Sequence, residues 1–99
     1  MDITVNEDGE FSYSHSVLRL REGDRVIFRS PDGPLSLHFG DRSPFGQVNV
    51  RTDRGQRMTA PMQVKTGAAG KKYTYMVSVY DERNDQVFFD SCPDIIVDC

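Results

Sequence analysis

The chain lacks tryptophan, has only two cysteines and contains no long apolar run. A helix that spans a bilayer needs about 20 consecutive apolar residues, so we expect no membrane segment. Met1–Thr4 has neither the basic start nor the apolar stretch of a signal peptide, which favours a cytoplasmic location. Cys92 and Cys99 would lie about 23 Å apart in an extended chain, so we expect free thiols and no disulfide framework.

The length of 99 residues predicts one domain, residues 1–99, with six phenylalanines and four tyrosines to build its core. The net charge of −3 is unevenly distributed. Residues 1–41 hold eight acids and four bases, residues 42–72 hold one acid and seven bases, and residues 73–99 hold six acids and one base. The pattern indicates either a basic patch on an acidic surface or charges that only solvate the surface.

The apolar residues follow a two-residue period, which is typical of β-strands. Nine strands are expected, at residues 3–5, 17–20, 25–30, 35–39, 47–51, 62–65, 72–80, 86–89 and 95–97. No segment has a helical period, because Pro61 interrupts residues 58–64, where at most one helical turn fits. Turn residues recur roughly every 8 to 12 positions, which predicts an antiparallel sandwich or barrel.

The longest expected strand places alternate apolar residues on one face, which is the strongest indication of a core wall. That face carries Tyr73, Tyr75, Val77 and Val79. A second wall is expected from Val26 and Phe28.

Two strings resemble the first half of a cupredoxin: residues 18–28, which read LRLREGDRVIF, and residues 34–39, which read PLSLHF. The segment at 70–77, GKKYTYMV, resembles the G-x-Y-x-F-x-C strand of that family, and residues 94–97 resemble its closing strand. The resemblance covers about two-thirds of the chain. It implies an all-β fold, an antiparallel Greek-key β-sandwich of cupredoxin or immunoglobulin type with seven to nine strands.

Two further strings resemble small bacterial copper-free cupredoxin-like proteins. Ser43-Pro44-Phe45 is similar to a string that recurs in them. The string from Asp90 to Asp94 approximates the Asp-Pro signature of the group called DP-EP. This second resemblance implies a bacterial protein without the copper of its fold.

The positions that would hold copper carry other residues. The alignment puts Leu35 where the family has its first ligand histidine and Val77 where it has its cysteine, and no His or Met lies between residues 78 and 95. No zinc-ligand spacing is present either, so we expect no metal and no cofactor. The alternative is an electron carrier with rebuilt ligands: His15, His38, Cys92 and one of Met58, Met62 or Met76.

A small enzyme is a second alternative. Cys92 is a candidate nucleophile, although the carboxylates of Asp90 and Asp94 beside it disfavour a thiolate. A carboxylate pair for acid and base chemistry could come from the acids at 81, 82, 85, 90 and 94, but residues 82–85 are expected to form a hairpin tip. We therefore predict no enzymatic activity.

The stretch from residue 42 to 62 is the strongest candidate for binding, because it is long, irregular and rich in arginine. The predicted contact residues are Arg42, Phe45, Arg51, Arg54, Arg57 and Met58. The alternative is a crossover loop whose arginines only pair with neighbouring carboxylates. The sequence thus predicts a non-enzymatic binding or assembly module.

The expected partner of this module is another protein or a second copy, docked through an edge strand or a sheet face. An anionic ligand is an alternative, because arginine side chains suit carboxylate and phosphate groups. The acidic pI of 5.2 argues against nucleic acid, and no membrane contact is expected.

Overall fold

The computed structural model describes residues 1–15, 17–40, 42–53, 55–91 and 93–98. All regular structure in these ranges is β, so no helix among them could span a membrane. The strands are β1 (Ile3–Val5), β2 (Phe11–Tyr13), β3 (Val17–Arg21), β4 (Arg25–Val26), β5 (Leu35–His38), β6 (Asn49–Arg51), β7 (Met62–Gln63), β8 (Lys71–Thr74), β9 (Met76–Asp81), β10 (Gln86–Asp90) and β11 (Asp94–Asp98).

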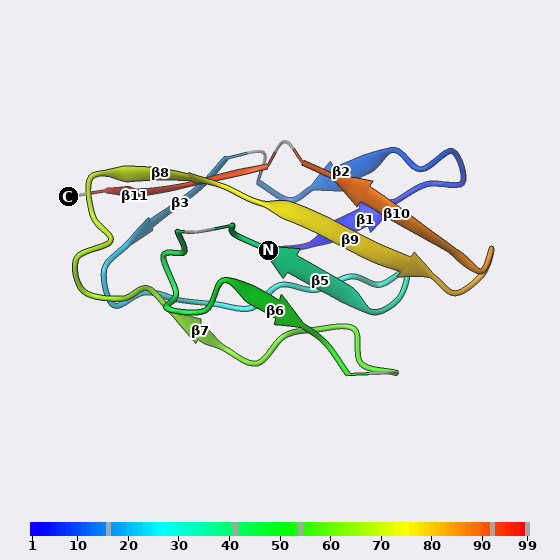
Figure 1. Ribbon diagram of the computed structural model, residues 1–99. Helices are drawn as coiled ribbons and strands as arrows, with labels where there is room; N and C mark the ends of the chain where they lie inside the picture. Colours follow the sequence, from blue (N-terminus) through cyan, green and yellow to red (C-terminus); the bar gives the residue numbers. More distant parts are fainter. Residues whose placement is uncertain (16, 41, 54, 92, 99) are drawn as a thin grey trace.

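The strands form a four-stranded sheet, β10-β9-β5-β6, a three-stranded sheet, β3-β11-β8, and two small sheets, β1-β2 and β4-β7. Figure 1 shows β8 continuing into β9 along the length of the molecule, so one stretch of chain contributes to both larger sheets. Asp2 forms a parallel bridge with Arg29, which forms an antiparallel bridge with Met58. These bridges join the two small sheets into one layer.

The prediction of an all-β, mostly antiparallel chain is confirmed, and the predicted strand count is too low. The structure has eleven strands in its described part because the segment expected at 72–80 breaks at Tyr75 and because Phe11–Tyr13 forms a further strand. One pairing among the named strands departs from the predicted antiparallel arrangement: β11 pairs parallel with β3, with Asp94 opposite Val17. These two strands lie far apart in sequence, so no tight hairpin forces them to run in opposite directions.

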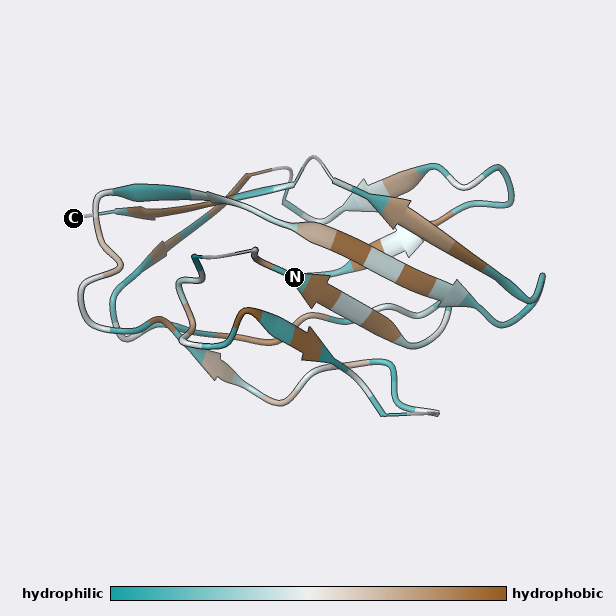
Figure 2. Ribbon diagram, in the orientation of Figure 1, coloured by the Kyte–Doolittle hydropathy of each residue, from teal (hydrophilic) through white to brown (hydrophobic). Residues whose placement is uncertain are grey.

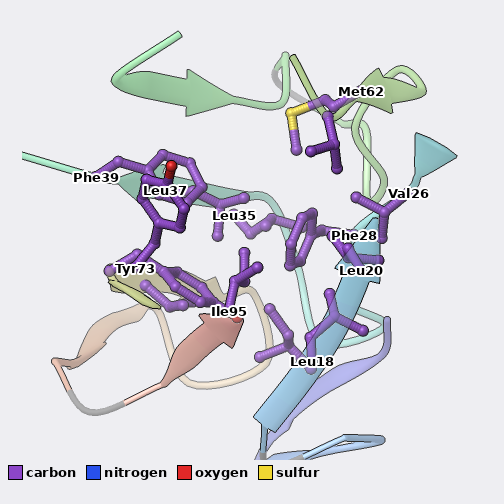
Figure 3. Close-up of a cluster of buried hydrophobic side chains, with 14 of the residues drawn as sticks. Leu18, Leu20, Val26, Phe28, Leu35, Leu37, Phe39, Met62, Tyr73 and Ile95 are labelled. Atoms are coloured by element: carbon purple, nitrogen blue, oxygen red, sulfur yellow. The ribbon is translucent and has the colours of Figure 1, made fainter. Parts of the chain in front are cut away.

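The core walls predicted from the alternating pattern are confirmed. Tyr73, Tyr75, Val77 and Val79 are all at most 5% exposed. Figure 2 shows the alternation along β9 as bands of apolar and polar residues. Phe28, which lies just after β4, is fully buried. Figure 3 shows the core cluster, in which residues from all the larger sheets meet: Leu18, Leu20, Phe28, Leu35 and Ile95.

Four aromatic rings pack together inside this core. The ring of Phe28 is 6.0 Å from that of Tyr75 and 6.3 Å from that of Phe45, and the ring of Phe39 is 5.6 Å from Phe45 and 5.3 Å from Tyr75. The Tyr75 hydroxyl is buried and has no hydrogen-bond partner in the described structure. Burial raises the pKa of Tyr75, and the charges of Asp94 and Asp90 add to the effect. This tyrosine stays neutral at physiological pH.

Candidate functional site

The outer face of the four-stranded sheet has an apolar half and a polar half. On β9, Val77 and Val79 face the core, so Met76, Ser78 and Tyr80 face outward. On β10 the outward residues are Val87, opposite Tyr80, and Phe89, opposite Ser78.

Four of these side chains make up what we call the apolar strip: Met76, Tyr80, Val87 and Phe89. Phe89 is 67% exposed and Val87 is 54% exposed, while Met76 and Tyr80 are about two-fifths exposed. Figure 2 shows the apolar residues of β10 as a long brown band beside those of β9. Single exposed apolar side chains are ordinary on a protein surface, whereas several neighbouring ones on a single sheet face form a continuous apolar patch.

The polar half lies over β5 and β6. The hydroxyls of Ser36 and Ser78 hydrogen-bond across the strands, and His38 Nδ1 lies 2.6 Å from Asn49 Oδ1. Arg51 is the β6 partner of Ser36, so its side chain belongs to the same outer face. The surface therefore changes from aromatic and aliphatic at β10 to polar and cationic at β6.

The hairpin between β9 and β10 is held by Asp81, a buried carboxylate at the end of β9. Asp81 accepts hydrogen bonds from the backbone N–H of Arg83 (3.0 Å) and from the side-chain amide of Asn84 (2.9 Å). The Arg83 guanidinium also pairs with Asp32 at 3.1 Å. The expected hairpin tip at residues 82–85 is confirmed as a turn. It fixes the alignment of the two strands that carry the apolar strip.

Replacing Asp81 with asparagine is expected to lower the melting temperature at pH 7 by several degrees. The Asn84 hydrogen bond, the Arg83 backbone N–H and the Arg83 charge together lower the pKa of Asp81, although burial opposes them. The pKa of Asp81 is thus lower in the folded protein than its unfolded value of about 3.9. The ionised carboxylate therefore stabilises the folded state at pH values above about 3.9. That contribution is lost as the pH falls through the folded-state pKa.

Thermal unfolding followed by circular dichroism from pH 7 to pH 2.5 measures this effect. The difference in melting temperature between the wild type and Asp81→Asn should become smaller below a pH of about 4. Asp98→Asn is the matched control, because Asp98 pairs with Arg19 on the exposed surface, where ion pairs contribute little. A difference that stays constant across the whole pH range would contradict the role assigned to the Asp81 charge.

The structure separates the residues predicted to bind in the 42–62 stretch. Phe45 is half-buried in the aromatic cluster, which gives it a packing role. Arg57 donates to Glu82 at 2.9 Å and to the carbonyl of Pro31, as expected for a crossover loop whose arginines meet neighbouring carboxylates. Arg42 and Arg51 are exposed and form no ion pair within the described ranges. Arg54 lies outside the described residues.

Met58 is half-exposed at the centre of shallow depressions between the N-terminus and the 56–61 loop. One of them, of about 620 Å³, is lined in part by Met1, Arg25, Ile27 and Arg29. The cationic character of this region is reduced because Arg29 pairs with Asp2 at 2.7 Å. Phe45 and Arg51 line a different depression, between β6 and β7. The five predicted residues with described positions therefore do not converge on one site.

The residues considered for metal chemistry are also dispersed. His15 contacts the Ser14 hydroxyl, His38 lies on the outer sheet face and Met62 is buried in the core. Among the residues with described positions, no three His, Cys, Asp or Glu side chains gather as a ligand set. Cys92 and Cys99 lie outside those positions, so the prediction of free thiols and the nucleophile alternative stay untested.

No family model, curated protein or solved structure matches this chain. The resemblance to cupredoxins therefore rests on the sequence strings alone.

The sequence reasoning missed the apolar strip, although a signal for it was present. Residues 87–89 read Val-Phe-Phe, three consecutive apolar residues in a strand. Side chains alternate between the two faces, so such a strand is apolar on both of them. In an antiparallel sheet with one covered face, the second apolar face is left in solvent.

Proposed function

We propose that this chain is a protein-binding module that docks through the apolar strip of β9 and β10. The observation that carries the proposal is that Phe89, 67% exposed, and Val87, 54% exposed, lie two residues apart on the same face of β10. Burial of such side chains contributes about 25 cal/mol per Å² of apolar area, and aromatic residues are frequent anchors of protein interfaces.

The surroundings of the strip favour a protein over a nucleic acid as partner. Beside the strip, Asp85 accepts a hydrogen bond from the Tyr80 hydroxyl. Its carboxylate would repel phosphate groups. The strip itself carries no positive charge, whereas nucleic-acid binding depends on lysine and arginine at the contact.

We further propose that the fold is the Greek-key sandwich of cupredoxin type that the sequence resembles. Support comes from the two aligned ligand positions, which sit on neighbouring strands and are apolar and buried: Leu35 is 3% exposed on β5 and Val77 is fully buried on β9. Such positions suit a sandwich whose metal site has been replaced by core packing. An experimental structure with a different order of strand connections would contradict this assignment.

Photo-crosslinking in the native cells tests the binding function. Benzoyl-phenylalanine placed at position 89 is expected to form covalent adducts, because this side chain would face the partner. The same group at position 17 is the matched control, since Val17 is also an exposed apolar residue, 41% exposed, and lies on β3 in another sheet. Adding Val87→Ser to the variant labelled at position 89 should reduce the adducts. Equal labelling from positions 89 and 17, or none from either, would contradict the proposed function.

A further inference from the structure

We propose that β10 pairs edge to edge with β10 of a second copy of this chain in an antiparallel arrangement. The pairing brings Val87 and Phe89, the β10 half of the apolar strip, into contact with the same residues of the second copy. This inference rests on the proposed function and names its partner. Two four-stranded sheets would thereby become one continuous eight-stranded sheet.

The backbone of β10 is open for such pairing. The Tyr80 N–H donates to the Pro34 carbonyl at 2.9 Å, so the backbone groups of residues 80, 78 and 76 point toward β5. Those of residues 77, 79 and 81 therefore point toward β10, opposite residues 90, 88 and 86. By the same alternation, the N–H and C=O groups of Val87 and Phe89 point outward in the plane of the sheet, on the side of β10 that faces away from β9.

Other sheet edges of the molecule carry features that discourage pairing. Beside β7, Pro61 has no N–H to donate. On β6, the edge carries the charged side chain of Arg51. In contrast, β10 has no proline, lysine or bulge from Gln86 to Asp90, and its pairing with β9 is continuous over these five residues. An unprotected apolar edge of this kind is a template for another strand.

The side-chain pattern selects one antiparallel register, centred on Phe88. In it, Val87 lies opposite Phe89 of the second copy, and the reverse pair follows by symmetry. Pairs of an aromatic with a β-branched residue are favourable across strands. Gln86 lies opposite Asp90 of the second copy, so an amide donor faces the one charged side chain of the strand.

Competing registers are less complementary. A parallel, in-register pair would put the two Asp90 carboxylates side by side, whereas the antiparallel pair holds them about 13 Å apart. A shift of two residues in one direction places Asp85 opposite Phe89 of the second copy. A shift in the other direction places Val87 opposite Ser91 and loses both pairs of an aromatic with a β-branched residue. The charge and apolar patterns thus agree on one arrangement.

The interface is small, because it consists of a five-residue strand edge and the side chains beside it. Interfaces below about 1,200 Å² in total area belong to weak or transient complexes. We therefore expect a dimer that dissociates in the micromolar range or above.

Sedimentation velocity of the purified full chain, from about 5 μM to 1 mM, tests the association. The wild type should shift from monomer to dimer with rising concentration. Val87→Lys should raise the dissociation constant by about tenfold or more, because the ammonium group would lie opposite an aromatic ring in the interface. Val17→Lys should associate like the wild type. A monomer at every concentration would overturn the inference.

Cross-linking tests the register on a chain with Cys92→Ser and Cys99→Ser. Val87→Cys of one copy and Phe89→Cys of another would form a hydrogen-bonded pair, with Cα atoms about 5.5 Å apart, which suits a disulfide. Mixing the two variants should therefore give the 87–89 disulfide faster than either the 87–87 or the 89–89 disulfide. Faster formation of a like-with-like disulfide would contradict the register.

Amide hydrogen exchange gives a third measurement that needs no substitution. Exchange at Val87 and Phe89 should slow as the concentration rises, while exchange at Phe88, which already bonds to β9, should change little. Equal exchange at low and high concentration would overturn the edge pairing.

The two proposals can fail separately. A purified chain that stays monomeric, together with position-89 adducts to a different protein, would overturn self-association and leave the binding function standing. The absence of both dimer and adducts would overturn both.

Discussion

Replacing Gly33 with alanine is expected to prevent folding or to lower the free energy of unfolding by at least about 3 kcal/mol. A Cβ atom at this position would lie 1.8 Å from the backbone carbonyl oxygen of Tyr80 and 3.3 Å from the Glu82 side chain. The oxygen cannot move aside alone, because β9 is anchored where the Tyr80 N–H donates to Pro34. The whole end of β9 would have to shift.

Gly23→Ala is the matched control for this substitution. Gly23 also has a positive φ, +87°, but nothing lies within 4 Å of a Cβ built on it. Its replacement should cost only the backbone strain, about 1–2 kcal/mol. Urea unfolding followed by circular dichroism measures both variants. Equal losses at positions 33 and 23 would contradict the close approach of the Gly33 turn to β9.

Replacing Phe28 with alanine is expected to lower the free energy of unfolding by about 3–5 kcal/mol. The ring is fully buried and packs edge-on against Tyr75 and Phe45, so its removal opens a cavity where strands from several sheets meet. A domain of this size is stabilised by only about 5–15 kcal/mol in total, so the variant should be partly unfolded in mild urea.

Phe89→Ala makes the same chemical change on the outer sheet face. Because Phe89 is 67% exposed, we expect its replacement to change the free energy of unfolding by no more than about 0.5 kcal/mol. Urea unfolding at low protein concentration, where the chain is monomeric, compares the two variants directly. A large loss from Phe89→Ala would show that this side chain supports the fold and would count against its role in docking.

The contrast between these two phenylalanines separates folding from binding. Substitutions in the apolar strip should change association without unfolding the chain. Substitutions around Phe28 should lower the free energy of unfolding, because they remove contacts within the core. They leave every side chain of the apolar strip in place.

Local periodicity predicted a large part of this fold. The alternation of Tyr73, Tyr75, Val77 and Val79 identified a buried face before any contact was known, and all four side chains are buried. The turn at residues 82–85 was likewise predicted from its composition. Such features depend on neighbouring residues, so the sequence contains them directly.

Features that depend on distant pairing were not predicted. The parallel pairing of β3 with β11 brings Val17 beside Asp94, and the Arg57–Glu82 ion pair joins two loops. No local pattern specifies either contact. The arginine-rich stretch was predicted to bind a partner, and its described residues include Phe45 in the aromatic cluster, Arg51 on a sheet face and Met58 at a separate depression.

The sequence by itself determined that the chain is all-β and which segments form most of the strands. Only the tertiary structure decided which apolar face is covered. Val79 and Val87 are both valines in strands of one sheet, but the first is fully buried and the second is 54% exposed. The physical reason is that a strand's own pattern sets which residues share a face, whereas packing of the other layers decides which face meets water.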